Sequence, residues 1–149
     1  MSQDPSSAYR VTAGSSATPV RLVILLYEQL IKDLQRAQTA IEKKDTEARS
    51  REIGHALLVV GQLQGTINHE RGGEVAGNLD RFYFLLRADL MEAQFKVAPY
   101  LLQKHMRSLI DLREAWLQVE REEKTAAPAA PPVQSPARDT FEKSSGWSV

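Results

Sequence analysis

The feature that most constrains the fold is an apolar block at the start of a helix, residues 18–28. Thr18 can cap this helix with its hydroxyl, and Pro19 suits the first helical position, where a missing N–H costs nothing. An almost unbroken run of apolar residues follows, from Val20 to Tyr27. A helix this apolar at its entrance must be covered on nearly every side. The sequence therefore predicts a helix that other elements surround.

Length and composition limit the fold and the functional class. A chain of 149 residues is long enough for one domain with a sizeable core and too short for two comfortable ones. Its formal net charge is zero, so nothing indicates binding to nucleic acid or to an acidic membrane surface. The absence of cysteine excludes disulfides, thiolate metal sites and a cysteine nucleophile. We expect a single domain without these chemistries.

Neither a leader nor a membrane span is expected. The first seven residues are polar and form no apolar signal-peptide core. The longest apolar run, near residues 22–27, is far shorter than a bilayer requires. The sequence thus predicts a cytoplasmic protein with no direct membrane insertion.

Helical periodicity runs through the middle of the chain and predicts an all-α, antiparallel four-helix bundle over residues 18–124. The expected helices span about 19–43, then from the N-cap Asp45 to near Glu70, then about 74–97, then from Pro99 to about 124. Gly72 and Gly73 are expected to form the turn before the third helix. Residues 1–17 are predicted to be a flexible arm, and the Pro/Ala-rich residues 125–149 a disordered tail.

Each helix carries an apolar stripe expected to face the core. The third helix has two such stripes, and the second has a line of glycines on another face. Helical glycines cost about 1 kcal/mol each relative to alanine, so a close approach by another backbone is expected there. The expected inward stripe of the third helix is Val75, Leu79, Phe82, Leu86 and Ala93, and that of the fourth is Leu102, His105, Leu109, Leu112, Trp116 and Val119.

The second stripe leaves two interpretations open. The third helix either packs on neighbours from both sides or forms one wall of an apolar groove that accepts a foreign helix. An exposed groove favours aggregation, so the N-terminal arm is a candidate lid, through Tyr9 and Val11, that a partner displaces. The candidate groove residues are Leu58, Gly61, Gly65, Phe84, Met91 and Phe95.

No catalytic, metal or cofactor site emerges from the sequence. Glu52 and His55 have the spacing of a di-iron motif, but no second copy accompanies them, and His55 is expected to point away from the core. Gly72-Gly73 is neither preceded by a strand nor followed by the lysine of a phosphate-binding loop. We therefore expect a non-enzymatic protein without cofactor or metal.

Several segments together resemble the FliS family, the export chaperones of flagellin. They are Tyr9, Thr18-Pro19, residues 25–28, residues 70–79, Phe82-Tyr83 and Ala115-Trp116. The resemblance covers roughly residues 8–120. It implies a holdase whose helical bundle wraps the disordered C-terminal segment of flagellin, prevents early polymerisation and passes flagellin to the flagellar type III export gate. It also implies that Tyr9 matches the family's N-terminal tyrosine.

The chain departs from the family pattern where the last helix begins. It has Gln94 and Pro99 where the family tends to have asparagine and then an aspartate cap, and the glycine line and Pro/Ala tail are also unusual. These departures leave client identity open. The alternative is a helical adaptor that binds another amphipathic helix or itself, so a monomer and a weak homodimer are both compatible with the sequence.

Overall fold

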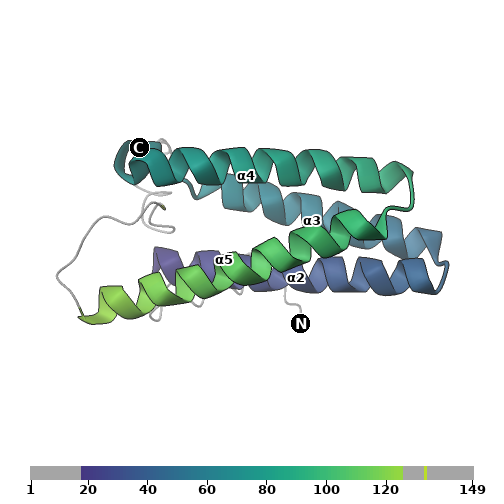
Figure 1. The fold of residues 1–149 in the computed structure, drawn as a ribbon, viewed down its shortest axis with the longest axis horizontal. Helices are drawn as coiled ribbons and strands as arrows, with labels where there is room; N and C mark the ends of the chain where they lie inside the picture. Colours follow the sequence, from purple (N-terminus) through teal and green to yellow (C-terminus); the bar gives the residue numbers. More distant parts are fainter. Residues whose placement is uncertain (1–17, 126–132, 134–149) are drawn as a thin grey trace, which may run out of the picture.

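The computed structural model describes residues 18–125 and Val133. Four helices make up this part of the chain: α2 (Pro19–Glu42), α3 (Thr46–Gly65), α4 (His69–Phe95) and α5 (Pro99–Thr125). They lie alongside one another with short connections, as Figure 1 shows, and the predicted all-α four-helix bundle is confirmed. Within these residues, no helix is long and apolar enough to span a membrane.

The start of α2 forms as the sequence predicts. The Oγ1 atom of Thr18 accepts a hydrogen bond of 3.0 Å from the backbone N–H of Arg21, and Pro19 opens the helix. Tyr27 and most of the apolar residues around it are buried. This burial follows from the position of α2, because it packs against both α3 and α5.

The bundle is not equally closed on all sides. α4 packs on α3, but of the neighbouring helix pairs α4 and α5 contact each other least. Figure 1 shows these two helices close together at their connection and diverging toward the end of the bundle where α4 begins and α5 finishes. α4 therefore packs mainly against α3.

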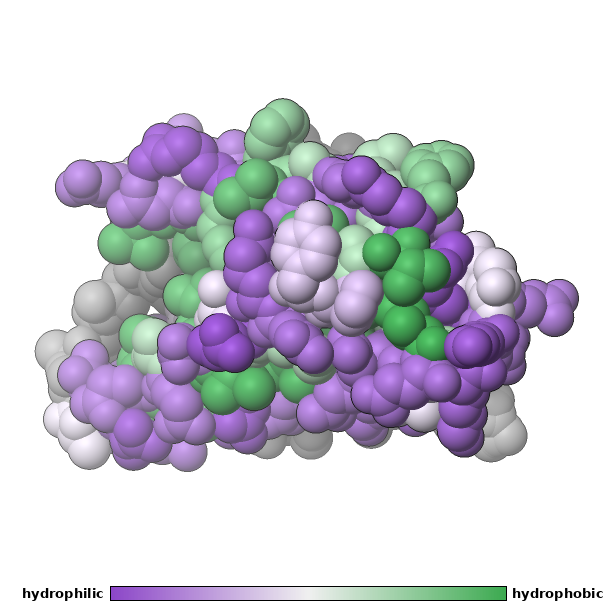
Figure 2. All heavy atoms as spheres, turned by 45° about the vertical axis from the view of Figure 1, so that its right-hand side comes forward, coloured by the Kyte–Doolittle hydropathy of each residue, from purple (hydrophilic) through white to green (hydrophobic). Residues whose placement is uncertain are grey.

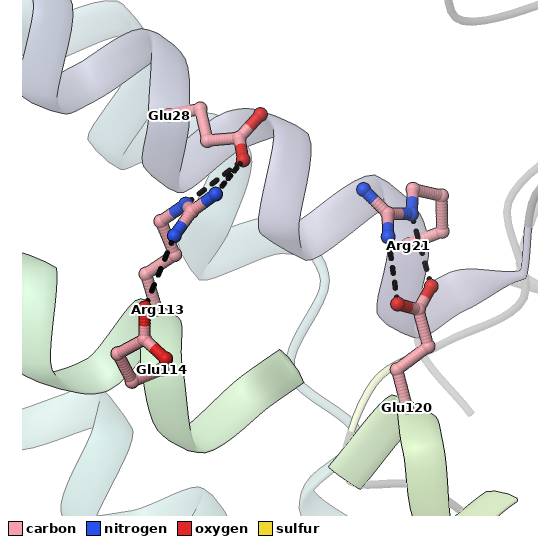
Figure 3. Close-up of polar contacts among 5 residues, drawn as sticks. All are labelled: Arg21, Glu28, Arg113, Glu114 and Glu120. Atoms are coloured by element: carbon pink, nitrogen blue, oxygen red, sulfur yellow. Dashed lines mark hydrogen bonds and ion pairs between the residues drawn. The ribbon is translucent and has the colours of Figure 1, made fainter. Parts of the chain in front are cut away.

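Two ion pairs fix α5 against α2 (Figure 3). Arg21 forms a two-pronged contact with Glu120, at 2.9 Å and 2.6 Å. Arg113 binds Glu28 at 2.8 Å through Nε and at 2.6 Å through Nη2. The arginine lies on α2 in the first pair and on α5 in the second. Both pairs can form together only in this antiparallel alignment of α2 and α5.

The boundary between α3 and α4 differs from the prediction. The second helix was expected to continue to near Glu70, but α3 ends at Gly65 and α4 begins at His69. The side-chain oxygen of Asn68 accepts a hydrogen bond of 3.0 Å from the N–H of Arg71 and so caps a new helix. Gly73, with φ 57° and ψ −131°, then kinks α4 near its start, so the predicted turn is a kink inside the helix.

The buried stripe of α4 is also rotated relative to the prediction. Val75 was expected to face the core but is exposed, and Phe82 is only partly buried. The reason is that α4 packs mainly on α3 and little on α5, which turns a different line of residues inward. Leu79, Leu86 and Ala93 are buried as predicted, and the other buried residues of α4 are Ala76, Tyr83 and Leu90. In α5, by contrast, Leu102, His105, Leu109 and Trp116 are buried as predicted.

One residue beyond α5 belongs to the core. Val133 is 3% exposed, packs within the main apolar cluster and forms an antiparallel bridge with Ile67 in the α3–α4 connection. The prediction of a disordered tail over residues 125–149 therefore fails at Val133, and also at Thr125, which is helical. The arm residues Tyr9 and Val11 lie outside the described residues.

Candidate functional site

The second apolar stripe of α4 faces solvent. Phe84 is 70% exposed, Met91 49% and Phe95 86%. A helix packed on both of its sides would bury these side chains, so that interpretation is excluded for the described chain. Figure 2 shows apolar side chains along the upper edge of the molecule, over α4, and further apolar side chains among hydrophilic ones on the rest of this face.

The glycine line of α3 faces α4. A Cβ atom at Gly54 would lie 3.8 Å from Nε2 of Gln94, and one at Gly61 would lie 4.0 Å from Nη1 of Arg87. These neighbours are ends of flexible side chains, and Gly65 has no neighbour within 4 Å. The expected close approach of another backbone is therefore not made by the described part of this chain. Packing within the bundle does not explain why these positions are glycine.

Helix geometry places the exposed apolar side chains of α4 and the glycine line of α3 on either side of Arg87 and Gln94. Residues three or four apart lie next to each other on a helix. Phe84 and Met91 are thus the neighbours of Arg87 on α4, while Leu58, which is 68% exposed, is the neighbour of Gly54 and Gly61 on α3. We call this surface the α3–α4 face; its residues are Leu58, Gly61, Gly65, Phe84, Met91 and Phe95, all of them exposed.

Sequence reasoning missed the polar residues along the middle of this face. Gln94 accepts a hydrogen bond of 3.2 Å from the hydroxyl of Ser50 through Oε1, and its backbone carbonyl accepts one of 3.4 Å from Arg49. Gln94 and Arg87 thus lie between the glycines and the exposed apolar side chains. Gln94 and Arg87 lie three and four residues from Met91, so helical spacing alone could have predicted that they lie next to it on α4.

A second feature is a cleft of about 410 Å³ between α2 and α3, with Leu58 on its lining. Asp33 is buried beside it and holds two partners: Nε2 of Gln29 at 2.9 Å and Nδ1 of His55 at 2.6 Å. His55 points away from the apolar core, as expected, but its contact with Asp33 was not predicted. Within residues 18–125 and Val133, no group of three or more potential ligands could hold a metal ion.

A polar contact joins α4 to α5. His105, on the apolar stripe of α5, has its Nε2 atom 2.7 Å from Oδ2 of Asp89, and Lys104 approaches the same carboxylate at 3.4 Å. Partial burial alone would raise the pKa of Asp89, but the hydrogen bonds and positive charges of His105 and Lys104 outweigh it and lower that pKa. Asp89 is therefore an ionised partner that lets a histidine lie in the core.

Taken together, the described chain offers an exposed apolar face and interhelical polar pairs that hold the bundle together. Asp33–His55 joins α2 to α3, and Asp89–His105 joins α5 to α4. Each of these acid–histidine pairs is accounted for by packing between helices. The α3–α4 face is the feature left without a role in folding.

Comparison with known proteins identifies the family. The model of the family described as flagellar protein FliS matches residues 1–123. The flagellar secretion chaperone FliSB of Pseudomonas aeruginosa is 35% identical over 102 residues, 68% of this chain and 81% of that protein. The flagellar secretion chaperone FliS of Bacillus subtilis is 28% identical over 122 residues, 82% of this chain and 90% of that protein. The flagellar secretion chaperone FliS of Vibrio cholerae is 26% identical over 108 residues, 72% of this chain and 79% of that protein. The chain belongs to the FliS family of flagellar proteins.

Proposed function

We propose that this protein is a cytoplasmic export chaperone that binds the disordered C-terminal segment of flagellin, prevents its premature polymerisation and assists its delivery to the flagellar type III export apparatus. Membership of the FliS family supports a role in flagellar export, because its curated members are flagellar secretion chaperones. The family is a chaperone class rather than an enzyme class.

The observation that carries the proposal is the α3–α4 face. Phe84, Met91 and Phe95 form an exposed line on α4, and Arg87 and Gln94 separate this line from the glycines of α3. An amphipathic helix places apolar side chains at intervals of three and four residues, and methionine and phenylalanine adapt to such partners. Glycines without a close neighbour let the backbone of a partner approach α3. A client segment that folds on binding spends part of the interaction energy on its own ordering.

The N-terminal arm is the proposed lid of this face in the absence of client. Tyr9 and Val11 are the apolar side chains that would cover it. If the arm competes with flagellin, deletion of residues 1–17 tightens flagellin binding. Unchanged or weaker binding by the shortened protein would contradict the lid.

Calorimetric titration with flagellin tests the proposal directly. Full-length flagellin is expected to bind tightly, and flagellin that lacks its C-terminal segment is expected not to bind. Binding of both forms would place the contact elsewhere on flagellin. Binding of neither, together with a mass that rises with protein concentration, would favour the alternative of a homodimeric adaptor that uses the α3–α4 face for itself.

A further inference from the structure

The end of the bundle where α3 passes into α4 holds a contact that the four helices do not explain. Val133 lies there, buried in the core and bridged to the backbone at Ile67. Between Thr125 and Val133 the sequence is Ala-Ala-Pro-Ala-Ala-Pro-Pro, which has no other large apolar side chain. Val133 is thus the one residue in this stretch suited to fill an apolar site.

The position of the contact follows from the topology. Antiparallel helices bring the start of α2, the end of α3, the start of α4 and the end of α5 to the same end of the bundle, and the Arg21–Glu120 pair confirms this for α2 and α5. Val133 lies eight chain steps beyond Thr125, a length that reaches roughly 25 Å when extended, and it pairs with Ile67 at this end. The chain is therefore long enough to bring Val133 to Ile67.

This end is also where the bundle is least closed. α4 and α5 contact each other least and diverge here (Figure 1), so the helices close this end of the bundle less than the other end. The backbone bridge at Ile67 is the form in which an extended peptide binds, by adding main-chain pairing to a side-chain pocket. A proline before the anchor residue suits such a peptide, since it favours extended backbone.

We propose that the Ile67 end of the bundle is a docking site for an extended apolar peptide, that the segment around Val133 occupies this site in the free protein, and that flagellin displaces it. The competition with flagellin rests on the proposed function. The docking of the segment does not. A single valine anchored by a chain of alanine and proline is a weak occupant, which a client with several apolar side chains can replace.

The first experiment tests docking without any client. In full-length protein with labelled isoleucine methyl groups, Val133→Asp is expected to shift the Ile67 signal and leave in place that of Ile53, which lies in the first half of α3. Ser145→Asp, which adds the same charge elsewhere in the tail, is expected to leave both unchanged. A peptide of residues 126–140 added to the Val133→Asp protein should restore the Ile67 signal, and the same peptide with Val133→Asp should not. An unchanged Ile67 signal in a normally helical Val133→Asp protein would refute the docking site.

The second experiment tests displacement. Titration of flagellin into the unlabelled full-length proteins is expected to show tighter binding by Val133→Asp than by Ser145→Asp, about tenfold if the site is filled in nine of ten free molecules. Val133→Ala, which only shortens the side chain, should lie between them. Equal affinities would refute competition. Absence of flagellin binding in every protein would refute the proposed function, while the methyl signals would still decide the docking site.

Discussion

The hydroxyl oxygens of Tyr27 on α2 and Tyr83 on α4 lie 2.8 Å apart in the interior of the bundle. Their rings meet edge to face, with centroids 6.4 Å apart. α2 and α4 are not neighbours like α2 and α3, so this hydrogen bond links the two helices across the core. Each hydroxyl is the buried partner that the other requires.

Loss of one hydroxyl is expected to destabilise the fold. Tyr27→Phe leaves the Tyr83 hydroxyl buried without its partner and should lower the free energy of unfolding by about 1–3 kcal/mol. The double variant, in which Tyr83→Phe is added, should cost less than the sum of the two single changes, since it leaves no buried hydroxyl unpaired. Urea unfolding of the three variants measures this coupling, and strictly additive losses would contradict it.

The same pair makes stability fall in alkaline solution. Burial raises the pKa of Tyr27 from 10.0 to about 12 and that of Tyr83 well above its usual value. Below pH 10 both residues are neutral in the folded and unfolded chain. Above it the unfolded chain loses protons first, so the free energy of unfolding drops between pH 10 and 12, by on the order of 2–3 kcal/mol from Tyr27. The double phenylalanine variant should show a shallower decline over this range.

Asp89 produces the opposite dependence at acidic pH. Its pKa is lowered in the folded protein, so its contribution is present above the ordinary aspartate pKa and is lost as pH falls through the folded value. Asp89→Asn is expected to cost about 1–3 kcal/mol at neutral pH, because His105 loses its charged partner in the core. It should also reduce the loss of stability in acid. The exposed Asp80→Asn is the matched control, and an equal effect of both changes would contradict the role of the His105 contact.

The connection between α2 and α3 contains a position that favours glycine. Lys44 has φ 57°, a left-handed conformation that costs a side chain about 1 kcal/mol or more. Lys44→Gly should therefore raise the free energy of unfolding by about 1 kcal/mol. Lys43→Gly is the control, because Lys43 has φ −90° and gains nothing from glycine. Thermal unfolding distinguishes the two; a higher melting temperature for Lys43→Gly would contradict this reasoning.

The sequence was sufficient where a local interaction decides the structure. The caps Thr18 and Asp45 each accept a backbone N–H three residues later, as predicted. The sequence alone was insufficient where a contact with a residue far along the chain determines the structure. Ile67 continues the spacing of the α3 stripe and is buried, but it lies beyond the end of α3, because Asn68 starts a new helix. Asp33 has a local partner in Gln29, four residues earlier, but its other partner, His55, comes from α3 and could not be read from the local sequence.

The candidate site shows the same division. The apolar line of α4 was visible in the spacing of Phe84, Met91 and Phe95, but periodicity alone did not distinguish a core face from an exposed one. That depends on which line of α4 the neighbouring helices cover, and the line that contains Leu79, Leu86 and Leu90 is the buried one. The docked position of Val133 depends on contacts with a distant part of the chain, at Ile67, so the composition of its segment gave no indication of it.

Substitution of a glycine in α3 is expected to have opposite effects on stability and on flagellin binding. Gly61→Ala adds a methyl group in ordinary contact with the end of Arg87, 4.0 Å away, and should stabilise the helix by about 1 kcal/mol. If a client backbone lies over this glycine, the same methyl group weakens flagellin binding. Opposite signs in thermal unfolding and calorimetric titration are therefore expected. Gln62→Ala, at the next exposed position of α3, should not weaken binding.

The sharpest test compares a buried apolar residue of α4 with an exposed one. Leu86 is fully buried and Phe84 is 70% exposed. Leu86→Ala should cost about 2–5 kcal/mol of stability through the cavity it leaves. Phe84→Ala should change stability by about 0.5 kcal/mol or less, as surface changes do, yet reduce flagellin affinity at least tenfold if Phe84 anchors the client. Met91→Ala should behave like Phe84→Ala. Normal flagellin affinity in both of these variants would remove the α3–α4 face as the binding surface, because the variants keep the fold and lose only the side chains proposed to make the contact.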